Sequence, residues 1–219
     1  TKETYIKEAH VLNLNQEIVV KFKRFFKRAM GQVYIPEELN ETSETILLHI
    51  SDTPENIYPF ILKLINKLSP DIIIHTGDLV DNYKLGLGLS ERRYEKKVIE
   101  LIEGLEDCNC NQIYIVPGNH DFRKVLENCK ENIIIKDEGS IINIEGKKIG
   151  LAHFMEKLPE NTILNLYGHN KRSPDIEGII CLNGILNINI VLFPSLKTFF
   201  IPYPGGTGLA RQYRRLKLP

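Results

Sequence analysis

The sequence predicts an α/β fold built on two packed β-sheets. The first half alternates buried apolar runs with amphipathic stretches of helical period, a pattern typical of a βαβαβ unit with parallel strands. The second half changes to short apolar runs separated by Gly, Asn, Asp and Pro, which indicate strands and hairpins. A chain of 219 residues is long enough to bury both sheets in one large domain.

The βαβαβ unit follows a polar N-terminal segment. Residues 46–51 are expected to form the first buried strand, and apolar residues recur at helical spacing over 55–68. Three consecutive isoleucines predict a central strand over 71–77 that is buried on both faces. A helix over 91–105 and a strand over 112–116 complete the unit, and its crossovers are expected to be right-handed.

The second half is expected to be rich in strands. A short helix is predicted over 122–130, directly after the third strand. Short apolar runs then predict strands at 132–135, 140–144, 147–154, 163–167, 178–182, 184–193 and 197–201.

Three regions are predicted along the chain. Residues 1–44 form an N-terminal helical extension packed on the domain, residues 45–202 the main domain, and residues 203–219 a flexible basic tail. Within the extension, residues 18–30 have the pattern of a basic amphipathic helix. Such a helix is expected to pack its aromatic face on the core, although binding to a membrane or a phosphate backbone remains an alternative.

Composition argues against several classes of partner. Lysine plus arginine and aspartate plus glutamate both number 28, and this balance argues against a nucleic-acid partner. No apolar run approaches the roughly 20 residues that span a membrane. The four cysteines show neither a disulfide framework nor the spacing of a zinc site, so we expect a reducing, cytoplasmic compartment.

Polar side chains stand at the ends of five of the predicted strands. In an open α/β sheet, ligands bind in the crevice beyond the carboxyl ends of the strands. Carboxylate, amide oxygen and imidazole together suit a divalent metal such as Mn, Fe or Zn, while the absence of thiolates disfavours a structural zinc site. The residues are Asp52, Asp78, Asp81, Asn119, His120, His153 and His169.

The order of these motifs resembles that of the calcineurin-like metallophosphoesterases, whose pattern is D-x-H, G-D-x-x-D, G-N-H-D/E, a lone H and G-H-x-H. The matching segments are Asp52-Thr-Pro54, Gly77-Asp78-Leu-Val-Asp81, Gly118-Asn119-His120-Asp121, His153 and Gly168-His169-Asn-Lys171. The resemblance implies an αββα sandwich of two packed mixed sheets flanked by helices. It also implies hydrolysis of a phosphomonoester or phosphodiester by in-line attack of metal-bound water.

The resemblance also implies a role for each matching residue. Asp78 would bridge two metals, and Asn119, His153 and His169 would complete one of the two sites. His120 would be the catalytic histidine that stabilises charge or protonates the leaving oxygen. Asp81 would orient His120. A histidine that titrates near pH 7 suits the acid role, and a carboxylate partner fixes its tautomer.

Two positions depart from the family pattern. Pro54 stands in place of one ligand histidine and Lys171 in place of another, and both missing ligands would serve the same metal. That site keeps only Asp52 and the bridging Asp78. We therefore expect one tight divalent metal (Mn, Fe, Zn or Ni) and a second, incomplete site.

Two residues could compensate for these losses. Strand alternation directs His49 into the sheet or to its opposite face, which disfavours it as a substitute ligand. The ammonium group of Lys171 could hold a phosphate oxygen where a metal would stand, or it could simply be exposed on a loop. His75 lies inside the central strand and is expected to be structural.

Three functions remain open on sequence alone. The first is a metallophosphoesterase acting on a phosphoester substrate. The second is a catalytically impaired scaffold or binding protein on the same fold, which Pro54 and Lys171 favour and the intact His120 disfavours. The third is a nucleic-acid-binding module that uses the basic helix and tail. The oligomeric state is left open.

Overall fold

The computed structural model describes residues 33–82, 91–126, 132–174 and 176–211. The chain divides into two compact units, residues 1–42 and 43–219, and each is described by itself. The described part of the first unit contains the short helix α2 (Glu38–Glu41). The basic helix predicted over 18–30 lies outside the described residues.

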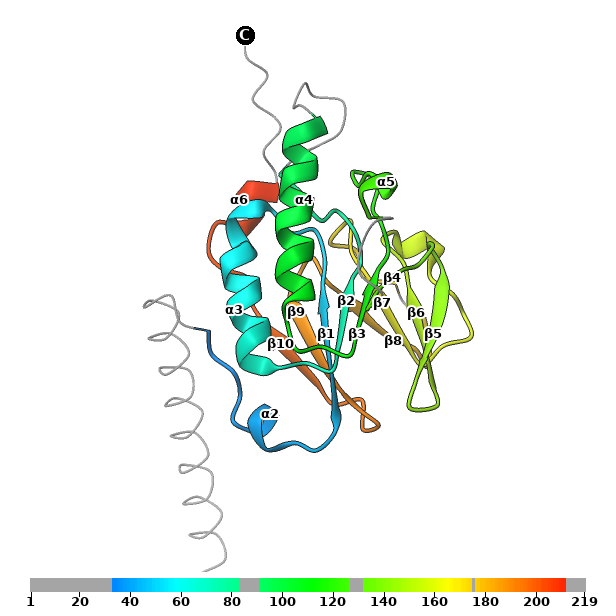
Figure 1. Cartoon of the computed structure of the whole chain (residues 1–219). Helices are drawn as coiled ribbons and strands as arrows, with labels where there is room; N and C mark the ends of the chain where they lie inside the picture. The colour runs from blue at the N-terminus through cyan, green and yellow to red at the C-terminus, as the bar shows by residue number, and fades with distance from the viewer. Residues whose placement is uncertain (1–32, 83–90, 127–131, 175, 212–219) are drawn as a thin grey trace, which may run out of the picture. The chain divides into compact units, whose positions relative to one another are not determined.

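The larger unit contains a six-stranded mixed sheet of order β10-β9-β1-β2-β3-β4 (Figure 1). The strands β1 to β4 are parallel, whereas β9 pairs antiparallel with both β1 and β10. The late strands β9 and β10 therefore extend a sheet that the first half of the chain begins. The bounds are β1 Thr45–Ile50, β2 Ile72–His75, β3 Gln112–Ile115, β4 Ile133–Ile135, β9 Ile188–Phe193 and β10 Thr198–Ile201.

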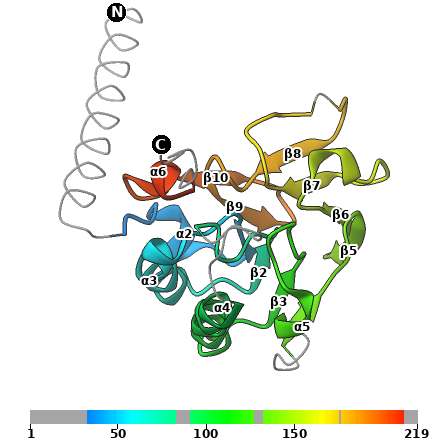
Figure 2. The ribbon, with the colours of Figure 1, turned by 90° about the horizontal axis from the view of Figure 1, so that it is seen from above.

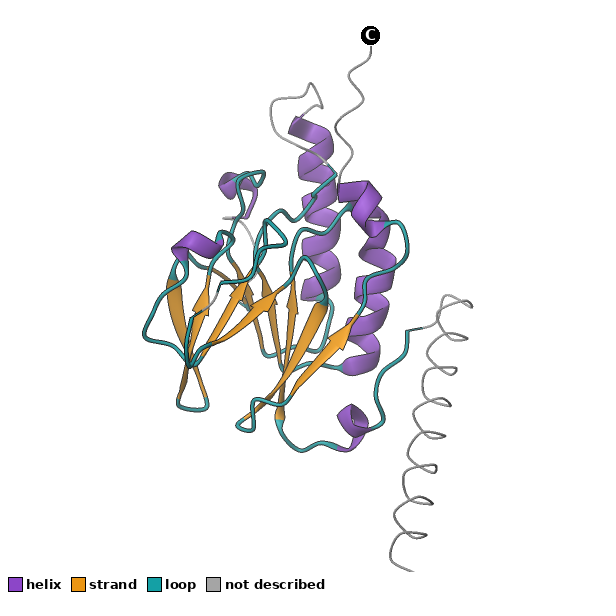
Figure 3. Ribbon diagram, turned by 180° about the vertical axis from the view of Figure 1, so that it is seen from behind, coloured by secondary structure: helices purple, strands orange, loops and turns teal. Residues whose placement is uncertain are grey.

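The second sheet has four strands in the order β5-β6-β7-β8, which Figure 1 labels. Figure 3 shows the strands of both sheets in orange, with the helices in purple. Strands β5 and β6 form an antiparallel hairpin, and β6, β7 and β8 run parallel. Glu145 and Gly146 both have positive φ at the hairpin turn, as the tight turns that match the twist of paired strands require. The bounds are β5 Ser140–Ile144, β6 Lys147–Leu151, β7 Leu164–Tyr167 and β8 Ile180–Asn183.

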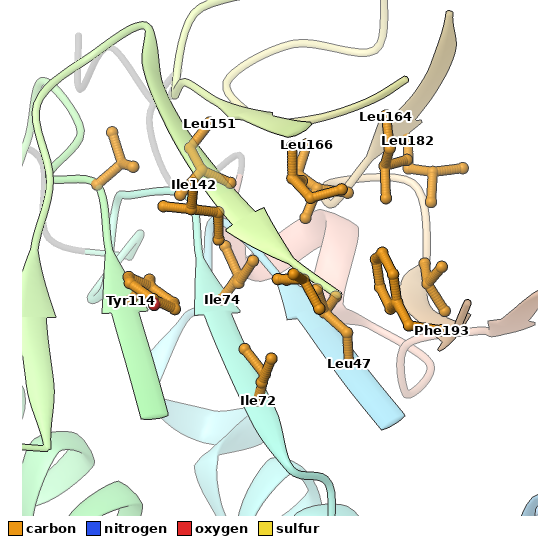
Figure 4. Close-up of a cluster of buried hydrophobic side chains, with 14 residues drawn as sticks. Leu47, Ile72, Ile74, Tyr114, Ile142, Leu151, Leu164, Leu166, Leu182 and Phe193 are labelled. Atoms are coloured by element: carbon orange, nitrogen blue, oxygen red, sulfur yellow. The ribbon is translucent and has the colours of Figure 1, made fainter. Parts of the chain in front are cut away.

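The two sheets pack face to face through one apolar cluster (Figure 4). Leu47, Ile74 and Phe193 enter it from the six-stranded sheet, and Leu151 and Leu166 enter it from the four-stranded sheet. Burial of these side chains is the main term that holds the two sheets together. The prediction of two packed mixed sheets is thus confirmed.

Helices cover the other face of the six-stranded sheet. Helix α3 (Tyr58–Leu68), preceded by the single turn η1 (Glu55–Ile57), lies beside helix α4 (Glu91–Glu106) on the face away from β5–β8 (Figure 2). Within the described ranges, no helix is both long and apolar enough to cross a membrane. The short helices α5 (Arg123–Leu126) and α6 (Thr207–Arg211) follow β3 and β10. Residues 127–130 of the helix predicted over 122–130 fall outside the description.

Candidate metal centre

The predicted site residues gather at the carboxyl ends of parallel strands. Asp52, Asp78 and His169 all have left-handed backbone conformations, with φ of 52°, 53° and 63°. Such conformations cost energy in residues other than glycine, and they cluster at functional sites because they aim side chains away from the strand direction. The residues are Asp52 after β1, Asp78 and Asp81 after β2, Asn119 and His120 after β3, His153 after β6 and His169 after β7.

Three of these side chains converge on one atom of a fourth, Nε2 of His153. This nitrogen lies 3.2 Å from Oδ1 of Asn119, 3.2 Å from Nδ1 of His169 and 3.7 Å from Oδ1 of Asp78. One ligand atom each from Asp78, His153 and His169 lies within 4.8 Å of the others, a spacing at which a metal ion could be held. The four side chains are those that the family resemblance assigns to the complete site.

The chemistry of this group fits a cation. Nδ1 of His153 donates to the carbonyl oxygen of Thr76 at 2.6 Å, so in the neutral ring Nε2 carries a lone pair. That lone pair faces the amide oxygen of Asn119 at 3.2 Å, and this oxygen has no hydrogen to donate. A backbone acceptor that fixes the tautomer in this way is typical of metal-ligating histidines.

The shifted pKa values of Asp78 and His153 also indicate that this place suits a cation. Burial raises the pKa of Asp78 to about 8, and the negative charges of Asp52, Asp121 and Asp81 add to the rise, although His153 opposes it. Burial alone would lower the pKa of His153, but the carboxylates of Asp78 and Asp52 outweigh it, and the pKa is raised. Positive charge is thus favoured at this place, and a divalent cation would provide it.

A second group consists of carboxylates only. One oxygen each from Asp52, Asp78 and Asp81 lies within 4.8 Å of the others, and each residue is only 2% exposed. Asp52 also accepts hydrogen bonds at Oδ2 from Ser51 Oγ at 2.6 Å and from the His169 amide at 3.0 Å. Sequence reasoning considered Asp81 only as a partner of His120, whereas it also stands beside the two carboxylates of the incomplete site. An all-oxygen set of this kind suits hard cations such as Mg²⁺ or Mn²⁺.

The two positions that depart from the family pattern differ in their surroundings. Pro54 is buried at the start of η1, and it has no side-chain donor. Lys171 is exposed, and it lies in the loop after β7. It is among the residues that line a cavity of this site, together with Asp52 and Asp78.

Asp121 is a supporting residue that sequence reasoning left without a role. Its Oδ2 accepts from the amides of Asp78 at 2.7 Å and Gly118 at 2.8 Å. Its Oδ1 accepts from the Leu79 amide at 2.9 Å and from the Tyr94 hydroxyl at 2.7 Å. Asp121 therefore joins the two segments that carry Asp78 and Asn119. The sequence feature that points to this supporting role is its place as the last residue of the G-N-H-D segment.

Two histidines in the strands are structural. His49 is fully buried, with Nε2 at 2.9 Å from the Thr76 hydroxyl and Nδ1 accepting from the Asn189 amide at 3.0 Å. Both ring nitrogens are therefore used within the core, and His49 does not replace a missing ligand. His75 is likewise buried and bonds to Thr53 Oγ1 and to the Gly77 amide, as expected for a structural residue.

Residues 203–211, which the sequence suggested as the start of a flexible tail, are packed against the end of β1. Nε of Arg211 donates to the carbonyl of Asp52 at 2.6 Å, and its two other nitrogens donate to the carbonyls of Ile185 at 2.6 Å and Ser51 at 3.1 Å. The guanidinium also lies 4.3 Å from the ring centroid of the buried Tyr203. Charge alone suggested a solvated segment, but these carbonyl acceptors hold it in place. Residues 212–219 lie outside the description.

A cavity of about 510 Å³ opens beside the metal-binding groups. Asp52, Asp78, Asp81, His120 and His169 line it, so both predicted catalytic residues and three of the candidate metal ligands face one space. The loop after β7, the β8–β9 loop and residues 202–211 contribute the remaining lining. His120 also donates its amide to Oδ1 of Asp78 at 3.0 Å, which ties the G-N-H-D loop to the shared carboxylate.

Comparison with known proteins gives a family and a fold. The model of the calcineurin-like phosphoesterase family matches residues 46–199. A solved crystal structure with 13% identity matches at a TM-score of 0.51, covering 73% of this chain and 99% of its own. The E. coli phosphoesterase Yfce matches at 15% identity and a TM-score of 0.45, covering 70% and 96% of the two chains.

A further solved structure, the nuclease MPE of Pseudomonas putida, matches at 14% identity and a TM-score of 0.38 over 70% of this chain and 87% of its own. No curated protein matched the chain. The structure with a TM-score of 0.51, at 13% identity, bears on the fold only.

Proposed function

Because the chain belongs to the calcineurin-like phosphoesterase family, we propose that it is a metal-dependent hydrolase of phosphomonoesters or phosphodiesters. The observation that carries the proposal is the convergence of Asp78, Asn119 and His169 on Nε2 of His153, where the amide oxygen of Asn119 faces the nitrogen lone pair of the neutral ring. A decayed scaffold would have no need to keep the polar side chains of Asp78 and His153 buried beside those of Asn119 and His169.

In this proposal each residue of the site has a distinct role. Asp78, Asn119, His153 and His169 hold one divalent cation, with Mn, Fe, Zn and Ni as candidates. When bound, such a cation supplies a Lewis acid that acidifies water and neutralises charge on the phosphoryl oxygens. His120 stabilises charge on the phosphoryl group or gives a proton to the leaving oxygen, and Asp81 orients it. Thr76 holds the tautomer of His153 through its carbonyl.

We also propose that Asp52, Asp78 and Asp81 could hold a second, weaker cation through oxygen atoms alone. In this proposal Asp81 replaces the histidines that Pro54 and Lys171 leave out. The absence of a disulfide framework supports a reducing, cytoplasmic compartment for the activity.

Metal content tests the proposal directly. The wild type is expected to retain about one tightly bound metal ion per chain, because one complete donor set is present. Asn119→Ala removes one donor and should lose both this metal and turnover of bis-p-nitrophenyl phosphate, measured by elemental analysis and absorbance. Asn161→Ala, at an exposed loop position, is the matched control and should keep both.

The number of metal ions bound per chain distinguishes the possible outcomes. About two metal ions per chain after loading with excess Mn²⁺ would support the carboxylate site. A protein that binds no divalent ion and has no turnover with any of them would refute the hydrolase and favour the scaffold.

Lys171 gives a separate prediction. If its ammonium group holds a phosphate oxygen, Lys171→Ala should raise KM by about tenfold, as expected for the loss of one charge-assisted contact. Metal content should stay the same. Arg172→Ala, which alters the exposed neighbour outside the cavity lining, should leave KM unchanged. Unchanged turnover and substrate binding in Lys171→Ala would show that this lysine is only a solvated loop residue.

A further inference from the structure

Two chemically different groups of residues line the cavity. One part of its lining consists of the buried carboxylates Asp52, Asp78 and Asp81 with His120 and His169. Another part is apolar and comes from two segments, Ile185 and Leu186 in the β8–β9 loop and Pro202 and Pro204 after β10. We call these four residues the apolar shelf. Hydrolysis of the phosphoryl group itself gives no reason for such residues to lie beside the metal-binding groups.

The apolar shelf is held firmly against the end of β1. The hydroxyl of Tyr203, between the two prolines, donates to the carbonyl of Gly184 at 2.7 Å. Arg211 donates to the carbonyl of Ile185 at 2.6 Å and to that of Asp52 at 2.6 Å. One guanidinium therefore links the loop that carries Leu186 to the residue that carries an active-site carboxylate. A surface fixed in this way is ready to bind a ligand at little entropic cost.

Exposure and size both indicate a site for an organic group. Leu186 is 46% exposed although it lies in the cavity, so part of its apolar surface is free to be covered. The cavity volume of about 510 Å³ falls in the range of roughly 300–1,000 Å³ that is typical of sites for organic ligands. A phosphate ion alone would leave most of this volume to water.

We propose that the apolar shelf is a subsite for the organic group of the substrate, and that the substrate is a small phosphate ester whose organic group is apolar, such as a ring or a short alkyl chain. The proposal rests on the proposed function, since it takes the phosphoryl group to lie at the metal centre. It disfavours long nucleic acids and highly charged polyphosphates, because these would place charge or hydrated sugar against the shelf.

Phosphonates test the subsite without turnover, because their phosphorus–carbon bond is not hydrolysed at such a site. Dissociation constants of methylphosphonate and phenylphosphonate are measured by calorimetry on the metal-loaded, full-length protein. Phenylphosphonate is expected to bind about tenfold more tightly than methylphosphonate, since partial burial of the ring against the shelf removes apolar surface from water.

Two leucine variants locate the effect. Leu186→Ser changes the exposed side chain of the shelf and should reduce the preference for phenylphosphonate to about threefold or less. Leu209→Ser is the matched control, because Leu209 lies in α6 with 75% exposure and is not among the residues lining the cavity. It should keep the full preference. Neither substitution removes a buried side chain, so both variants are expected to fold.

The outcomes separate this inference from the proposed function. Equal binding of the two phosphonates by the wild type would overturn the subsite while leaving the hydrolase intact. An equal loss of preference in Leu186→Ser and Leu209→Ser would also overturn it. If neither phosphonate binds and no ester is hydrolysed at any metal loading, the proposed function fails and the subsite fails with it.

Discussion

Replacement of His120 by alanine is expected to lower kcat by about 10²–10⁴-fold, the range typical of a general acid or base. His120 lines the cavity together with Asp78 and Asp81, and it is not one of the three side chains that converge on Nε2 of His153. Its loss should therefore leave the metal content unchanged. Elemental analysis and steady-state kinetics on the same preparations measure both quantities.

Esters with different leaving groups distinguish the two roles proposed for His120. If His120 protonates the leaving oxygen, the loss in kcat should be much smaller for a p-nitrophenyl ester than for an alkyl ester, because p-nitrophenolate leaves without a proton. Equal losses for the two esters would point instead to charge stabilisation on the phosphoryl group. A variant that has lost its metal, or that retains full kcat with both esters, would contradict a catalytic role.

Acid is expected to destabilise the fold through two buried histidines. Burial lowers the pKa of His49 from 6.5 to about 3, and burial with nearby positive charge from His49, His153 and Arg211 lowers that of His75 to about 3. Hydrogen bonding explains why both rings must stay neutral. Nδ1 of His49 accepts from the amide of Asn189, and Nδ1 of His75 accepts from the amide of Gly77. A proton on either nitrogen would face a donor.

The direction and size of the effect follow from linkage. Below pH 6.5 the unfolded chain takes up a proton on each histidine while the folded protein does not, so stability falls as the pH falls toward 3. At pH 5, about 1.5 units below the unfolded value, each histidine should have removed about 2 kcal/mol of unfolding free energy, or about 4 kcal/mol together. Urea unfolding at several pH values measures this loss.

A variant isolates the contribution of one histidine. In His49→Gln an amide that stays neutral replaces the ring, so stability should fall less steeply with acid, by about 1.4 kcal/mol per pH unit between pH 6 and 4. Only the slope is compared, because the substitution also changes the absolute stability. Parallel profiles for the wild type and His49→Gln would show that His49 does not titrate in this way.

Local pattern predicted most of the elements of this fold. The isoleucine run before Gly77 is β2, and the helical stripe over 55–68 is η1 followed by α3. Both follow from side-chain periodicity, which a sequence displays directly. Pairing between distant strands has no such local signal. The run over 184–193 was expected to be a strand, but its antiparallel place beside β1 depends on the core that closes around it.

The sequence by itself, through the motifs that carry the family resemblance, predicted which side chains would meet at the candidate metal site. Asp78, Asn119, His153 and His169 each follow a strand in a recognisable motif, and parallel strands bring their carboxyl ends to one edge. Only the tertiary structure decided that Asp81 stands beside Asp52 and that Arg211 is anchored at the end of β1. The physical reason is that these contacts depend on backbone turns and carbonyl acceptors, which leave no trace in residue type or spacing.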